Sequence, residues 1–158
     1  MPGYHDKRYT HQAGYCMYRT DDIARAVELA GNLNGPTLML GHGPPQQQGP
    51  TGLDHVPEAG NVGDPELAAA LEQAKIPFGV FGHILEAGGR ATDLSGKREI
   101  KPLSWSETLY VNPGSANSIP WLMNDGTNSK GLASIITISA DRKARYEVIR
   151  PPGRGDSR

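Results

Sequence analysis

The length, composition and charge of this chain of 158 residues exclude several classes of protein. A formal net charge of -1 at pH 7 provides no basic field that would attract nucleic acid or an anionic membrane surface. The single cysteine, Cys16, cannot form an intramolecular disulfide, and no apolar run is long enough to span a bilayer. From the length and from these two exclusions, we expect one cytoplasmic domain over residues 1–150. The 20 glycines and 13 prolines indicate long loops in this domain, and residues 151–158 are expected to form a flexible tail.

Two helices are predicted in the first half of the chain. Thr20 is a suitable N-cap, and the segment after it places apolar residues on one face and two aspartates in the first turn, up to Gly31. Asp64 is an N-cap of the same kind, because Pro65 follows at the first helical position and an apolar stripe continues to Ala74.

Each predicted helix is followed by a short apolar segment that ends in a Gly-His pair. The segment 37–40 leads to His42, and the segment 76–81 leads to His83. Both segments have the length and the flanking glycines of buried strands. Ligands of an open sheet collect at the carboxyl ends of its strands, so we expect both histidines at the same edge.

The remaining segments define the fold class. Residues 43–63 are rich in Gly, Pro and Gln, which predicts a functional or disordered loop with its three consecutive glutamines in solvent. A Gly-rich loop is expected at 86–100, and a strand at 108–112. Strands at 132–139 and 144–149 would form a C-terminal hairpin. The predicted class is α/β: a mixed sheet with helices between the early strands and an antiparallel hairpin at the end.

Three motifs occur in an order that resembles a known family. They are LMLGHGPP, VFGHILEAGG and LYVNPGSA, and the segment PGYHD near the start adds a further match. In this order they look like the later motifs of the calcineurin-like metallophosphoesterases, over about residues 2–139. The resemblance implies a partial form of that family's two-sheet sandwich, with a dinuclear metal centre at the strand ends. It also implies that metal-activated water hydrolyses a phosphate ester.

The resemblance implies a role for three histidines. His42 corresponds to the family's single-histidine metal ligand, and His83 corresponds to the first histidine of its Gly-His-x-His motif. His5, in PGYHD, corresponds to the catalytic histidine that hydrogen-bonds the phosphate and the leaving group. The implied cofactor is a divalent metal such as manganese, zinc, iron or nickel. The implied ligand is a phosphate ester or another phosphate-bearing molecule.

The chain departs from the family pattern at several metal ligands. Leu85 replaces the second histidine of Gly-His-x-His, Tyr4 replaces the asparagine of Gly-Asn-His-Asp, and the Asp-x-His and Gly-Asp motifs are absent. Two neutral imidazoles hold manganese or magnesium weakly, whereas zinc, nickel or copper would be held if a third group joined them. The candidates for that group are His5, Asp6, Asp54 and His55.

Two functions remain open from the sequence. The chain is a metal-dependent phosphoesterase that needs groups from an N-terminal segment or a partner chain, or it is a catalytically inactive binding or assembly module. The second function predicts a homo-oligomer or another partner at the sheet edge where the family's N-terminal strands would pair. Trp105 and Trp121 belong either to loop packing or to an exposed apolar patch. The alternative for His42 and His83 is that each is simply a histidine in the loop after a strand and binds no ligand.

Overall fold

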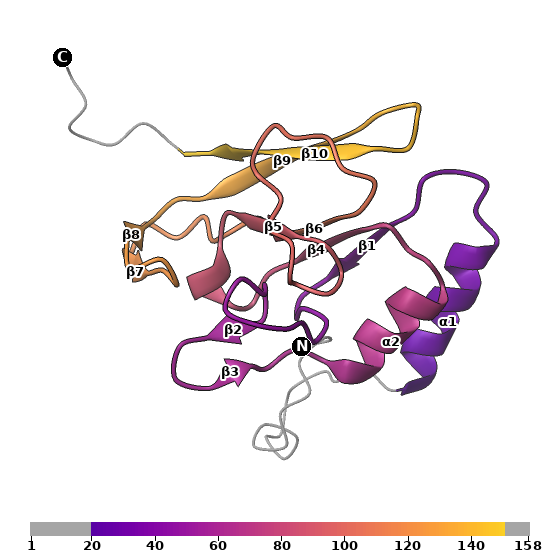
Figure 1. The fold of residues 1–158 in the computed structure, drawn as a ribbon, viewed down its shortest axis with the longest axis horizontal. Helices are drawn as coiled ribbons and strands as arrows, with labels where there is room; N and C mark the ends of the chain where they lie inside the picture. The colour runs from indigo at the N-terminus through magenta and orange to yellow at the C-terminus, as the bar shows by residue number, and fades with distance from the viewer. Residues whose placement is uncertain (1–19, 151–158) are drawn as a thin grey trace.

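The structure is a computed structural model that describes residues 20–150. His5, Asp6 and the predicted tail at 151–158 lie outside the described residues. Two helices, a four-stranded mixed sheet and an antiparallel hairpin form successive layers, as Figure 1 shows. This mixed α/β arrangement with a C-terminal antiparallel hairpin confirms the predicted class. None of the described helices has the length and hydropathy needed to cross a membrane.

The central sheet combines three parallel strands with one antiparallel strand. In spatial order its strands are β1 (Leu38–Gly41), β4 (Phe78–Phe81), β6 (Leu109–Asn112) and β5 (Arg90–Thr92). The first three run parallel, and β5 pairs antiparallel with β6. The carboxyl ends of β1, β4 and β6 therefore reach the same edge of the sheet.

Two helices cover one face of this sheet, and the sequence predicted both of them. They are α1 (Thr20–Gly31) and α2 (Pro65–Gln73), and the Asp64 carboxylate caps α2 by accepting a hydrogen bond of 2.8 Å from the Leu67 amide. Between the helices and the sheet lie buried apolar side chains: Ile23, Leu67, Leu71, Phe81 and Tyr110. The apolar stripe of each helix thus faces the sheet, as its spacing predicts.

The C-terminal hairpin covers the opposite face. It consists of β9 (Ala133–Ile138) and β10 (Ala144–Ile149), which pair antiparallel. Successive side chains of a strand point to opposite faces, so Tyr110 packs toward the helices while Leu109 and Val111 pack toward the hairpin. A second cluster of buried apolar side chains fills this side: Phe78, Ala91, Ile100, Leu109, Val111, Ala144 and Tyr146.

Several short elements were not predicted from the sequence. They are β5, the turn of 3-10 helix η1 (Leu85–Ala87) and two small hairpins formed by β2 (His55–Val56) with β3 (Gly60–Asn61) and by β7 (Trp121–Leu122) with β8 (Asn128–Ser129). Figure 1 places both small hairpins on the side of the sheet where β4 leads into η1. Apart from β5, which lies within the sheet, the elements missed by the prediction therefore lie near the carboxyl ends of the parallel strands.

The loop at 43–63 is ordered around one buried carboxylate. Asp54 is fully buried, and its Oδ2 accepts hydrogen bonds from the main-chain amides of Gln47 and Gly63, each of 3.0 Å. Its Oδ1 accepts a bond of 2.8 Å from Nδ2 of Asn61. A charged acceptor that satisfies three donors fixes the two ends of this segment against each other.

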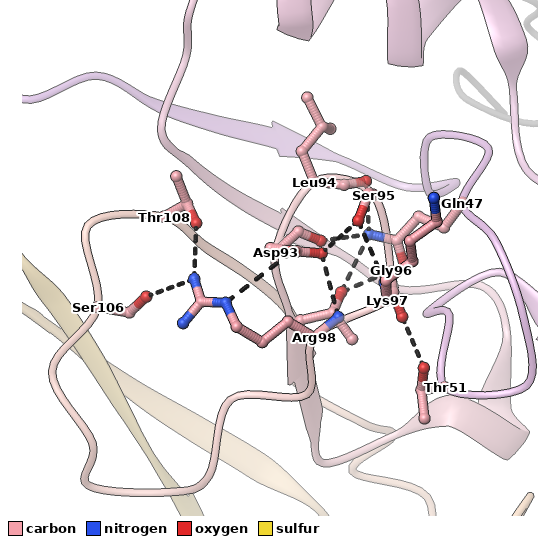
Figure 2. A network of polar contacts seen from close by, with 11 residues as sticks. Gln47, Thr51, Asp93, Leu94, Ser95, Gly96, Lys97, Arg98, Ser106 and Thr108 are labelled. Atoms are coloured by element: carbon pink, nitrogen blue, oxygen red, sulfur yellow. Dashed lines mark hydrogen bonds and ion pairs between the residues drawn. The ribbon is translucent and has the colours of Figure 1, made fainter.

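Gln47 joins this loop to the central sheet. Its side-chain amide is buried and donates to Oγ1 of Thr92 at 3.0 Å and to the carbonyl oxygens of Asp93 at 3.0 Å and Leu94 at 3.2 Å. Figure 2 shows this side chain directed at the turn that follows β5. The expectation that glutamines 46–48 lie in solvent is therefore wrong at its central residue, because Gln47 bonds to a turn far along the chain.

Strand β1 lies at one end of the sheet. Among residues 20–150 it pairs only with β4, so its outer edge has no described partner strand. Leu38 and Leu40 point away from the helices, and Leu40 is 74% exposed. In the described part of the chain, the outer edge of β1 is therefore open.

Candidate functional site

Two imidazoles meet at the carboxyl ends of β1 and β4. His42 follows β1 directly, and His83 follows β4 after Gly82. His42 Nε2 lies 2.8 Å from His83 Nδ1, so one ring donates a proton to the lone pair of the other. The ring centroids are 4.8 Å apart and the ring planes are inclined by 71°. The prediction that both histidines share one edge of the sheet is confirmed.

The pairing of the strands explains why the two rings meet. Gly41 lies opposite Phe81 in the parallel register, and the Gly82 amide donates a hydrogen bond of 2.9 Å to the His42 carbonyl. His83 then adopts a φ of 68°, which is uncommon for a residue other than glycine. Such backbone conformations cluster at functional sites, where the surrounding structure holds them in place.

The third parallel strand supports the turn at His83. Asn112 ends β6, is buried, and donates a hydrogen bond of 2.7 Å from Nδ2 to the Ile84 carbonyl. Its Oδ1 accepts a bond of 3.0 Å from the Gly114 amide, where φ is 84°. Asn112 is therefore a positioning residue, although the sequence predicted it only as the end of a strand. Its signal in the sequence is an asparagine that closes a strand immediately before Pro-Gly.

The electrostatic surroundings favour a neutral His83. Loss of water around its ring lowers the pKa of His83, and the nearby His42 ring lowers it further, while Glu86 acts in the opposite direction. A neutral imidazole keeps the lone pair that a metal ion or a donated proton requires. The pair is thus suited to share a proton or to bind a cation near neutral pH.

His42 and His83 offer two imidazole donors, which do not fit a dinuclear centre. Two imidazole nitrogens on one tetrahedral zinc ion, bound at about 2.0–2.1 Å, lie roughly 3.3 Å apart. The observed distance of 2.8 Å between His42 Nε2 and His83 Nδ1 would have to increase by about half an ångström, which small rotations of the two side chains supply. Within residues 20–150, no group of three or more His, Cys, Asp or Glu side chains could hold a metal ion.

The two described candidates for a third ligand have other surroundings. The Asp54 carboxylate is occupied by its three hydrogen bonds inside the loop. The His55 carbonyl accepts a bond of 2.9 Å from Nδ2 of Asn124, and the buried His55 Nδ1 has no hydrogen-bond partner among the described residues. Neither joins His42 and His83 in a group that could hold an ion.

Leu85 follows His83 after Ile84 and begins η1. Its side chain lines a small pocket together with residues of the β7–β8 hairpin and of the segment at 129–132. The position at which the resembled family has a second histidine is therefore part of an apolar wall in this chain.

No family model, no curated protein and no solved structure matches this chain. Function is therefore inferred from the residues and from their geometry.

Proposed function

We propose that this chain is a metallophosphoesterase-like domain that binds one divalent metal ion through His42 and His83. Hydrolysis of a phosphate ester at this site would require further ligands from outside residues 20–150. The observation that carries the proposal is the 2.8 Å approach of His42 Nε2 to His83 Nδ1 at the ends of neighbouring parallel strands. The order of the three motifs supports the same reaction class.

The ligands decide which ion and how much activity we expect. Imidazole suits zinc and nickel, whereas manganese and magnesium prefer carboxylate and other oxygen donors. A bound ion would polarise a phosphate oxygen and lower the pKa of bound water. Since the described residues form no group of three or more His, Cys, Asp or Glu side chains at the two rings, a second ion has no place there. We therefore expect zinc binding with slow turnover or none by the chain alone. The catalytic role proposed for His5 concerns a residue outside the described part.

Metal binding is tested with the full chain freed of metal. Zinc is titrated against a chromophoric chelator for the unmodified protein, for His42→Ala and His83→Ala, and for His55→Ala as a matched control. We expect each of the first two substitutions to weaken zinc binding by at least about tenfold, while the control retains it. Hydrolysis of an aryl phosphodiester with added zinc or manganese is measured on the same samples. Unchanged zinc affinity in both variants would refute the proposed site.

A second candidate function is self-assembly, and the open edge of β1 favours it. In the described part of the chain this edge lacks a partner strand, and Leu38 and Leu40 beside it are exposed. Two copies could pair their β1 strands around a two-fold axis and continue the sheet. Sedimentation velocity over a range of concentrations should then show a dimer that Leu40→Lys dissociates. A monomer at every concentration would contradict this candidate.

A further inference from the structure

The connection between α1 and β1 contains the only Asn-Gly pair of the chain, which is Asn34 and Gly35. Figure 1 shows this connection as a loop at the periphery of the fold, running from the end of α1 to the start of β1. Both residues are exposed to solvent. Among residues 20–150, neither the Asn34 side chain nor the Gly35 amide takes part in a hydrogen bond.

The other six asparagines of the chain are more restrained than Asn34. In five of them the side chain takes part in a hydrogen bond: Asn32, Asn61, Asn112, Asn117 and Asn124. The sixth, Asn128, lies in β8, where it pairs with Leu122 of β7. Asn34 is therefore the asparagine whose carboxamide is free to turn toward the next main-chain nitrogen.

The residue that follows Asn34 leaves that nitrogen open to reaction. Glycine has no Cβ, so its amide is the least hindered of any residue. A Cβ built at Gly35 would meet no atom within 4 Å, and the φ of Gly35 is not positive. Nothing in the described structure therefore blocks the approach of the Gly35 nitrogen to the Asn34 carboxamide.

We propose that Asn34 is a site of spontaneous deamidation. The Gly35 main-chain nitrogen loses its proton and attacks Asn34 Cγ; the new bond from this nitrogen to Cγ forms, the bond from Cγ to Nδ2 breaks, and ammonia leaves. Water then opens the cyclic imide. If the new bond to Cγ breaks, residue 34 becomes aspartate, and if the main-chain bond breaks, it becomes isoaspartate. In sum, one water is consumed and one ammonia is released, with no oxidation or reduction.

The product places a new negative charge between α1 and β1. Helix α1 ends at Gly31 and has no basic residue in its last turn, so the new carboxylate adds to the partial negative charge at the end of this helix. Isoaspartate also lengthens the main chain of the connection by one carbon atom. Asn34 precedes β1 whereas His42 follows it, so the two lie at opposite ends of the strand. We therefore expect deamidation to destabilise α1 and to leave zinc binding unchanged.

The reaction is tested by incubating the full chain in mildly acidic, neutral and mildly alkaline buffers, with peptide mapping by mass spectrometry at every asparagine. We expect Asn34 to react at least about tenfold faster than any other asparagine. Its rate should rise with pH, because the attacking amide must lose its proton. In Gly35→Ala the added methyl group fits the structure but hinders the attack, so the rate at Asn34 should fall at least about tenfold. Gly31→Ala is the matched control, since a Cβ there also meets no atom within 4 Å, and the rate should stay the same.

Several results would overturn the inference. They are faster conversion of another asparagine, an equal rate in Gly35→Ala, a rate that does not depend on pH, and conversion of Asn34 only after unfolding in urea. Asn34→Asp represents the aspartate product in the zinc titration, and a loss of zinc affinity in this variant would contradict the placement of the new charge away from the histidines. Failure of the unmodified chain to bind zinc would refute the metal site and leave the deamidation site unaffected.

Discussion

Asp54 was a candidate metal ligand from the sequence, whereas its hydrogen bonds indicate that it stabilises the loop at 43–63. The effect of replacing it on the free energy of unfolding can be predicted in detail. Oδ2 accepts two main-chain hydrogen bonds and Oδ1 accepts one from Asn61. Hydrogen bonds to a charged group contribute about 1.5–3 kcal/mol each, and donors left buried without a partner add to the cost. For Asp54→Ala we expect a loss of about 3–5 kcal/mol in the free energy of unfolding, a large part of the stability of a small domain.

Asp54→Asn is the sharper test because it preserves the shape of the side chain. Its one oxygen can still accept from the amides of Gln47 and Gly63, but its amide nitrogen would face Nδ2 of Asn61. Asn61 cannot turn its own amide over without losing the bond that Nδ2 donates to the Gly49 carbonyl. We therefore expect a loss of about 1–3 kcal/mol.

Urea unfolding followed by tryptophan fluorescence measures this loss, provided that the slope with denaturant stays constant. Asp125→Asn is the control, since Asp125 is an exposed carboxylate in a local turn, and its effect should stay below about 1 kcal/mol. Zinc affinity should be the same in Asp54→Asn as in the unmodified chain. Full stability with weakened zinc binding would refute the structural role and make Asp54 a ligand.

Three further predictions follow from the site and from the core. Leu85→His adds an imidazole beside the pair and should raise zinc affinity by about tenfold or more; an unchanged affinity would show that this position is out of reach. In His42→Ala the pKa of His83 should rise, because the His42 ring that disfavours protonated His83 is removed; a histidine titration by nuclear magnetic resonance measures this pKa. Because the folded-state pKa of His83 is lowered, its contribution to stability is present above the unfolded-state pKa of about 6.5 and is lost as pH falls below it. Tyr110→Phe removes the buried hydroxyl that donates to the Ile76 carbonyl and should cost about 1–2 kcal/mol, read from the urea midpoint.

The sequence predicted those features that depend on local patterns. The apolar stripes predicted both helices, and the Asp64 N-cap predicted the start of α2, whereas Thr20, predicted as an N-cap, is the first residue of α1. Each helix is followed by a short apolar strand, and this repeated order predicted that His42 and His83 meet at one edge of the sheet. Parallel pairing of β1 with β4 was sufficient to bring the two rings together, because strands that run in the same direction end on the same side. No contact between distant side chains was needed to foresee it.

The features that the sequence did not predict depend on contacts between distant segments. Strand β5 is only three residues long and lies inside a Gly-rich segment, so its pairing with β6 is what makes it a strand. The fold of 43–63 depends on the Asp54 carboxylate and on Gln47 reaching Thr92, neither of which has a periodic signal. Asn112 was predicted only as the last residue of a strand, and its bond to Ile84 was missed because it joins the ends of two different strands.

Leu85 lies close to the histidine pair in sequence and also lines the small pocket beside η1. A histidine there would give the pair a third imidazole, whereas the leucine gives the adjacent pocket an apolar wall. In Leu85→His, zinc should therefore be bound more tightly if the new imidazole reaches the pair, while a polar ring replaces apolar surface at the wall of the pocket. This one side chain therefore separates the described site from the motif of the resembled family, and its substitution tests whether position 85 lies within reach of an ion held by His42 and His83.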